Sequence, residues 1–264
     1  LDQHSESYRK IRNTFRYLLG NLKDNFDEIN LQNVKPEELP ELEQLMLHKI
    51  YSLDRKFKKY FQSYDFHNLY KELLNFCTVD LSAFYFDIRK DVLYCDPEES
   101  KKRKSTLILL DIILNSLLRW FAPILAFTTE EIYQLVSKKN KSVHLEQFIN
   151  FPKEFENKEL SKKWDEILKI RDICNISIEE KRASKEIGSS LEADLEIKLN
   201  HKLLKLTKEI DFAELCITSK FLVKESKEDE IIVKTKKAKG NKCPICWKIA
   251  LDACERHLCP IGKH

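Results

Sequence analysis

The chain has 264 residues, of which 42% are hydrophobic and 34% are charged, and its formal net charge is +3. These values predict a water-soluble globular protein of about two domains. No apolar stretch approaches the roughly 18 residues of a membrane-spanning helix, so we expect no membrane segment. The chain opens on Leu1, and no charged segment followed by an apolar one comes after it. We therefore expect no signal peptide, and we interpret the chain as a piece of a longer protein.

Glycine is scarce, with only four residues in the whole chain. A nucleotide-binding sheet needs a glycine-rich turn, because the phosphate must approach a backbone that carries no Cβ. That class of fold is therefore excluded. The abundance of Leu, Ile, Lys and Glu instead predicts a mainly α-helical protein.

The N-terminal half carries the 3.6-residue periodicity of amphipathic helices almost throughout. We predict helices over 4–23, 40–62, 66–90, 99–121 and 128–138, then an extended segment over 142–150. Helices joined by short connections bury their apolar stripes against one another in a bundle. The first predicted domain is therefore a helical bundle over 1–152.

The remainder of the chain predicts a small α+β domain and a short tail. A helix over 158–186 ends before Gly188, which suits a C-terminal cap. The next segments predict a strand over 194–200, a helix over 201–210, and strands over 214–223 and 229–237. With its Lys-rich linker at 235–242, this second domain covers 153–240, and the tail covers 241–264.

The first predicted helix is amphipathic in an unusual way. Its apolar stripe is formed by Ile11, Phe15, Leu18 and Leu22. Its opposite face carries Arg9, Arg12, Arg16 and Lys23, with Asn13 beside them. Arginine can fork onto phosphate oxygens or stack on bases, so this face is a candidate for binding nucleic acid. An ordinary solvated helix face has the same spacing, and that interpretation stays open.

The tail contains a cysteine pattern typical of a metal site. Cys243 and Cys246 are separated by two residues, so both thiolates can reach one tetrahedral zinc ion. Cys254 and Cys259 are the available partners, and His257 and His264 are reserve ligands. We predict one structural Zn²⁺ ion, with a metal-free remnant as the alternative. A closed site of this kind has no open position for catalysis.

Two further features of the tail bear on its partner. Trp247 follows the cysteine pair directly and could stack on a base or pack against the metal loop. Residues 231–264 contain eight Lys or Arg against two acidic residues, a net charge of +6, which leaves −3 for the rest of the chain. A basic tail on a mildly acidic body indicates contact with a polyanion.

The other cysteines, Cys77, Cys95, Cys174 and Cys216, are scattered in apolar or mixed segments, so we expect reduced, buried thiols. No histidine is paired in sequence with a candidate nucleophile, and no nucleophile turn is present. We therefore expect no catalytic residue in this chain.

Three segments of the bundle resemble the anticodon-binding domain of the isoleucine, valine and leucine members of the class I aminoacyl-tRNA synthetase family. They are SESYRKIRNTFRYLLGNL at 5–22, VDLSAFYFDIRKDVLYCD at 79–96 and RWFAPILAFTTEEIY at 119–133. The segment at 164–199, with IGSSLEA at 187–193, is similar to isoleucine enzymes, and CPICW at 243–247 resembles their C-terminal zinc finger. Valine enzymes lack that finger, so the resemblance favours the isoleucine type.

The resemblance implies that the bundle binds the anticodon stem-loop of isoleucine tRNA, through Arg9, Arg12, Asn13 and Arg16, with Trp247 as a further contact. It also implies a cytoplasmic, monomeric enzyme that joins isoleucine to tRNA with ATP and Mg²⁺, bound by an N-terminal catalytic domain that this chain lacks. No editing domain is present either.

One departure concerns the finger: the family motif ends in a second Cys-x-x-Cys, and Gly262 stands where its last cysteine belongs. Cys254 or His264 could substitute, or the finger could be defective.

Three alternatives remain open from the sequence. A free-standing zinc-dependent nucleic-acid-binding module would share the basic tail and the cysteines. An α-helical interaction scaffold would share the bundle alone, and a valine-type C-terminal region would share the bundle without the finger.

Overall fold

The computed structural model describes residues 2–22, 31–137, 141–252 and 254. These residues form two compact units. The first contains Leu1–Leu93 and Glu98–Lys158, and the second contains Tyr94–Pro97 and Glu159–His264.

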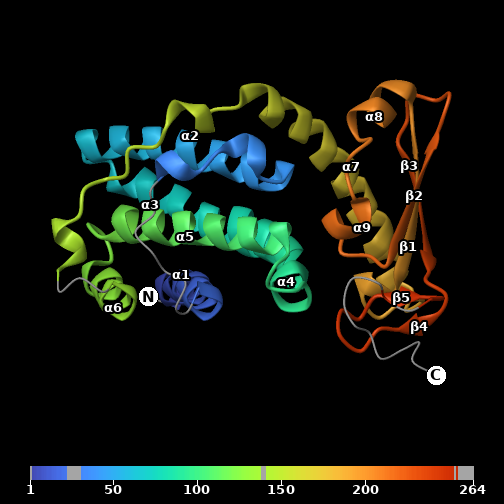
Figure 1. Ribbon diagram of the computed structural model, residues 1–264, viewed down its shortest axis with the longest axis horizontal. Helices are drawn as coiled ribbons and strands as arrows, with labels where there is room; N and C mark the ends of the chain where they lie inside the picture. Colours follow the sequence, from blue (N-terminus) through green and yellow to red (C-terminus); the bar gives the residue numbers. More distant parts are fainter. Residues whose placement is uncertain (1, 23–30, 138–140, 253, 255–264) are drawn as a thin grey trace. The chain divides into compact units, whose positions relative to one another are not determined.

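The first unit is built from helices, as predicted (Figure 1). Its long elements are α1 (Asp2–Leu22), α2 (Glu41–Ser63), α3 (Phe66–Asn75), η4 (Phe76–Tyr85), α4 (Phe86–Cys95), α5 (Lys101–Phe121) and α6 (Ala126–Val136). Short 3-10 turns are η2 (Leu31–Asn33), η3 (Pro36–Glu38), η5 (Val143–Leu145) and η6 (Lys153–Phe155).

Two sequence predictions for this unit need correction. The helix predicted over 66–90 continues to Cys95, and its middle part, η4, is a π-helix with wider turns. The segment over 142–150 is not extended throughout, because η5 interrupts it. The side chain of Ser142 caps that turn by accepting a hydrogen bond from the backbone N–H of His144.

Helix α5 forms the centre of the bundle, and nearly its whole circumference is buried. Trp120 near its C-terminal end packs edge-on against Phe57 of α2, with ring centroids 5.0 Å apart. Phe121 meets Phe15 of α1 at 6.0 Å. The apolar stripe of α1 predicted from the sequence is buried in full, so this contact turns the opposite face of α1 toward solvent.

A buried ion pair crosses the bundle. Arg89 of α4 donates two hydrogen bonds to the Glu43 carboxylate of α2, from Nε at 2.6 Å and from one terminal nitrogen at 2.8 Å. The Tyr85 hydroxyl also donates to Glu43 at 3.0 Å. Burial is the main cause that raises the pKa of Tyr85 well above its usual value, followed by the charge of Glu43.

The second unit combines the long helix α7 (Lys158–Ala183) with a three-stranded sheet (Figure 1). The strand order is β2–β1–β3, with β1 (Ala193–Leu199) parallel to β2 (Lys220–Glu225) and antiparallel to β3 (Ile232–Lys237). Alternate residues of β1 are buried, as expected for a central strand with one covered face. Two short helices, α8 (His201–Leu206) and α9 (Phe212–Leu215), connect the parallel strands.

Two details of this unit differ from the prediction. The left-handed residue that follows α7 is Lys185, with φ of 60°, and Gly188 is not in that conformation. The strand predicted over 214–223 begins only at Lys220, because Asp211 caps α9 by accepting a hydrogen bond from the N–H of Glu214. The helix therefore takes the first residues of the predicted strand.

A hairpin of β4 (Asn241–Lys242) and β5 (Ile249–Ala250) brackets the Cys243–Cys246 pair. Gly240 opens it with φ of 127°, and a Cβ there would lie 2.1 Å from the carbonyl oxygen of Ala250. Only glycine fits such a close approach of two backbones. The hairpin and this glycine thus give residues 240–250 a defined local fold.

Candidate nucleic-acid interface and metal centre

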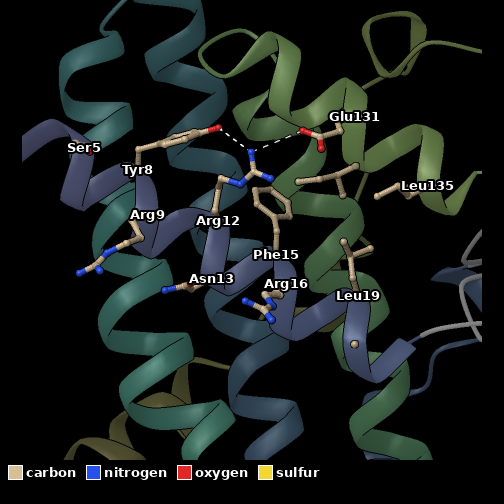
Figure 2. A pocket seen from close by; sticks show the side chains of 12 residues that line it. Ser5, Tyr8, Arg9, Arg12, Asn13, Phe15, Arg16, Leu19, Glu131 and Leu135 are labelled. Carbon is tan, nitrogen blue, oxygen red and sulfur yellow. Dashed lines mark hydrogen bonds and ion pairs between the residues drawn. The ribbon is translucent and has the colours of Figure 1, made fainter.

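The solvent-facing side of α1 lines a pocket of about 760 Å³ in the first unit, together with residues from α6 (Figure 2). The lining residues are Ser5, Tyr8, Arg9, Arg12, Asn13, Phe15, Arg16, Leu19, Gly20, Glu131, Ile132 and Leu135. All four residues predicted from the helix wheel, Arg9, Arg12, Asn13 and Arg16, are among them. The pocket therefore joins a basic helix face to an apolar floor.

Arg12 turns toward α6, as Figure 2 shows. Its guanidinium donates a hydrogen bond of 3.3 Å to the Tyr8 hydroxyl and lies 3.7 Å from a carboxylate oxygen of Glu131. The Tyr8 hydroxyl also shares a hydrogen bond of 2.8 Å with Thr128. The hydrogen bonds with Thr128 and then Arg12 lower the pKa of Tyr8. Arg12 is thus held at the side of the pocket by groups from both helices.

Arg9 forms an exposed ion pair with Glu6 one turn earlier, at 2.6 Å. The basic face predicted from the sequence included neither Glu6 nor Glu131, so both ion pairs are findings of the structure. Exposed ion pairs of this kind contribute little, typically about 0–1 kcal/mol, because water and salt screen them. An incoming phosphate can therefore compete with either carboxylate for its arginine.

Arg16 and Asn13 are both exposed, and neither side chain makes a hydrogen bond or an ion pair with any residue that the structure describes. In Figure 2 both side chains project from α1 on the side away from Glu131. A guanidinium and a carboxamide with unused donors can bind phosphate oxygens and base edges. These two residues are the most available part of the predicted interface.

Gly20 continues this face near the end of α1, and a Cβ placed on it would have no atom within 4 Å. A glycine inside a helix destabilises it by about 0.5–1 kcal/mol relative to alanine. No atom of the described residues lies so close that it would exclude a side chain at this position, so crowding does not explain the loss of helix stability. The absence of a side chain instead leaves the backbone of α1 open to a ligand in the pocket.

Of the predicted metal ligands, the structure brings together Cys243, Cys246 and Cys254 in the second unit. Their sulfur atoms all lie within 4.8 Å of one another, and the Sγ atoms of Cys246 and Cys254 are 3.9 Å apart. Sulfur atoms bound about 2.3 Å from a tetrahedral zinc ion lie about 3.8 Å apart. Cys259, His257 and His264 fall outside the described residues.

The backbone around the pair adopts a tight turn. The N–H of Ile245 donates to Cys243 Sγ at 3.4 Å, and the N–H of Trp247 donates to the carbonyl oxygen of Cys243 at 3.0 Å. Burial raises the pKa of Cys246 to about 12. A metal ion must therefore displace a proton to bind this thiol, as metal ions do at thiolate sites. The three cysteines could hold a metal ion.

Trp247 is 59% exposed, in the left-handed conformation with φ of 63°. The ammonium of Lys242 lies 5.4 Å from the centre of its ring. The tryptophan thus presents a flat apolar surface next to a positive charge, outside the buried cysteines.

No helix within the described ranges is both long and apolar enough to cross a membrane.

Residues 43–198 match the family described as "Anticodon-binding domain of tRNA ligase". The chain belongs to this family, which is a class of domain found in tRNA ligases. The matched range begins after α1 and ends in β1, so it includes most of the bundle and all of α7.

Within that class, the relatives are isoleucine–tRNA ligases. The chain is 66% identical over 257 residues to the isoleucine–tRNA ligase of Pelagibacter ubique, an alignment that covers 97% of this chain and 28% of that protein. It is 40% identical to the enzyme of Agrobacterium fabrum, over 94% of this chain and 26% of that protein. It is 39% identical to the enzyme of Bartonella henselae, over 96% of this chain and 27% of that protein. The chain thus spans little more than a quarter of these relatives.

These relatives support the isoleucine type predicted from the sequence. They do not support the alternatives of a valine-type region or a free-standing nucleic-acid-binding module.

Proposed function

We propose that this chain is the tRNA-binding, C-terminal part of an isoleucine–tRNA ligase and that α1 grips the anticodon stem-loop. Membership of the anticodon-binding domain family carries this proposal. The exposed Arg16 and Asn13 on the pocket of α1 support it, because they offer unused donors at one surface. Phosphate contacts by arginine provide affinity, and contacts to splayed loop bases provide sequence selection.

Within this proposal, Arg9, Arg12 and Arg16 bind the RNA backbone and Asn13 reads a base edge. Arg12 and Arg9 exchange their carboxylate partners for phosphate. The tail supplies a second contact, in which Trp247 stacks on a base beside Lys242, and one structural Zn²⁺ holds the tail through Cys243, Cys246 and Cys254. Zinc fits the all-sulfur donor set better than hard cations such as Mg²⁺ do.

The activation of isoleucine with ATP and Mg²⁺ belongs to the catalytic domain of the whole enzyme. That domain is the chain's first partner and isoleucine tRNA is its second, in a monomeric cytoplasmic enzyme. The role of this chain is to bind and orient the RNA.

The proposal predicts anticodon-dependent binding. The full chain should bind an isoleucine tRNA transcript at least about tenfold more tightly than a transcript with an exchanged anticodon, because one lost bidentate base contact costs about 1–3 kcal/mol. Fluorescence anisotropy over a salt series measures both affinities. Equal, purely salt-sensitive binding to both transcripts would reduce the chain to a basic module, and absence of binding to either would contradict the proposal.

A second prediction concerns Gly20. Gly20→Ala should stabilise the bundle by about 0.5–1 kcal/mol, because alanine favours the helix and its methyl group meets no atom within 4 Å. If RNA lies against this face, the same variant should bind the tRNA severalfold more weakly. Urea denaturation and anisotropy measure the two effects, which have opposite signs. Stabilisation with unchanged binding would place the RNA away from Gly20.

A further inference from the structure

Four cysteines from two distant parts of the sequence gather in the second unit. Cys243 and Cys246 form a small buried cluster, against which Cys254 and Cys95 pack. Cys95 is the last residue of α4, and the segment Tyr94–Pro97 belongs to the same compact unit as the tail. The three described tail cysteines occupy three positions of a tetrahedral ion, and Cys259 lies outside the described residues.

We propose that Cys95 supplies the fourth thiolate to this metal ion. The inference rests on the proposed metal site and adds to it a ligand from outside the tail. Its consequence is that the ion takes a ligand from the segment Tyr94–Pro97 of the same unit, instead of closing a finger made by the tail alone.

The position of the Cys95 side chain supports this assignment. Its Sγ donates a hydrogen bond of 3.8 Å to the carbonyl oxygen of Ile245, which lies between the two cysteines of the turn. The sulfur is outside the group of three within 4.8 Å. Rotation of this partly exposed side chain from the carbonyl oxygen toward the three sulfurs would complete the set.

The other described cysteines offer no such ligand. Cys77 is buried in the helical bundle of the first unit. Cys174 and Cys216 are both buried, and the contact with Cys216 raises the pKa of Cys174. Among the described cysteines, Cys95 therefore stands alone beside the three tail thiols.

The turn has basic residues next to it that can offset part of the charge of a thiolate site. Four thiolates and one Zn²⁺ carry a net charge of −2, which needs nearby cations. Lys242 and Lys248 flank the cysteine pair, and the N–H of Cys243 donates to the carbonyl oxygen of Lys248 at 2.8 Å, which fixes the turn between them. Such surrounding groups tune a metal site as its direct ligands do.

The test uses Co²⁺ as a spectroscopic probe for zinc in the full chain. The wild type should give tetrahedral bands, and its thiolate-to-cobalt charge-transfer band should fall by about a quarter in Cys95→Ser, since four thiolates become three. Competition with a chelator measures the affinity for Zn²⁺. Loss of a group that only supports a metal ligand lowers metal affinity by roughly 10- to 100-fold, so Cys95→Ser, which removes a ligand, should lower the affinity for Zn²⁺ by at least that much. Cys254→Ser is the positive control, and Cys259→Ser tests the rival fourth ligand from the tail, which should matter less than Cys95.

A second measurement avoids the variants. Alkylation of the wild-type chain, read by peptide mass, should label Cys95 without zinc and leave it protected with zinc. An unchanged spectrum in Cys95→Ser, a loss in Cys259→Ser instead, or labelling of Cys95 with zinc present would overturn its role while leaving the metal site in place. Failure of the wild type to bind Co²⁺ or Zn²⁺ would overturn the metal site itself.

Discussion

Replacing Arg89 by methionine should lower the free energy of unfolding of the helical bundle by about 3–5 kcal/mol. The variant leaves the Glu43 carboxylate buried, with the hydroxyls of Tyr85 and Thr106 still in contact with it at 3.0 and 3.4 Å. Two hydroxyl donors do not replace the bidentate charged partner, so the buried charge is left uncompensated. Urea denaturation followed by circular dichroism at the helical band measures the loss.

Two controls separate the lost ion pair from a general effect on α4. Lys90→Met removes the next charge along the same helix, but its pair with Asp87 is exposed, so the change should stay within about 0.5 kcal/mol. The double variant Glu43→Leu/Arg89→Met removes both charges and should recover most of the loss, because an apolar pair satisfies a buried site. A double variant as unstable as the single one would contradict this account.

The pair also illustrates what could be predicted from the sequence and what could not. The helices of the bundle follow from local periodicity, and each long predicted helix is present. Glu43 and Arg89 are 46 residues apart, and nothing local marks either as buried or as a partner of the other. The π-helix of η4 escaped prediction for a similar reason, because an amphipathic pattern does not distinguish its wider turns from α-helical ones.

The second unit shows a related limit. The strand β1 was predicted because its alternating pattern matches a central strand, whereas the segment before β2 also alternates and yet begins with α9. There the capping of the helix by Asp211 decides the structure, and the alternation of the following residues does not.

In the candidate sites, too, contacts between residues close in sequence could be predicted, whereas contacts between distant segments could not. The spacing of Cys243 and Cys246 predicts their contact, because the two ligands lie on one turn. Cys95 lies 150 residues from Ile245, so only the fold brings it to the cluster. On α1, the helix wheel found the basic face, but Glu131 and Thr128 come from α6 and could be placed only by packing. They hold Arg12 and Tyr8, and this leaves Arg16 as the more accessible arginine.

This accessibility leads to the prediction for RNA binding. Arg16→Ala should weaken binding of the isoleucine tRNA transcript about tenfold at moderate salt. It should also reduce the slope of log affinity against log salt by about 0.7–0.9, the contribution of one phosphate contact. Because Arg16 has no partner among the described residues, the stability of the bundle should stay within about 0.5 kcal/mol of the wild type.

The matched control is Arg55→Ala, which removes an exposed arginine from α2 at a position outside the α1 pocket. Both variants lose one positive charge, so a long-range effect of net charge would weaken binding equally in both. Arg16→Lys separates charge from geometry: it should keep the salt slope and lose part of the affinity, because lysine cannot form the two-pronged contact. If Arg16→Ala and Arg55→Ala matched in affinity and slope, the RNA would lie elsewhere on the bundle, and the exposed face of α1 would be an ordinary solvated helix face.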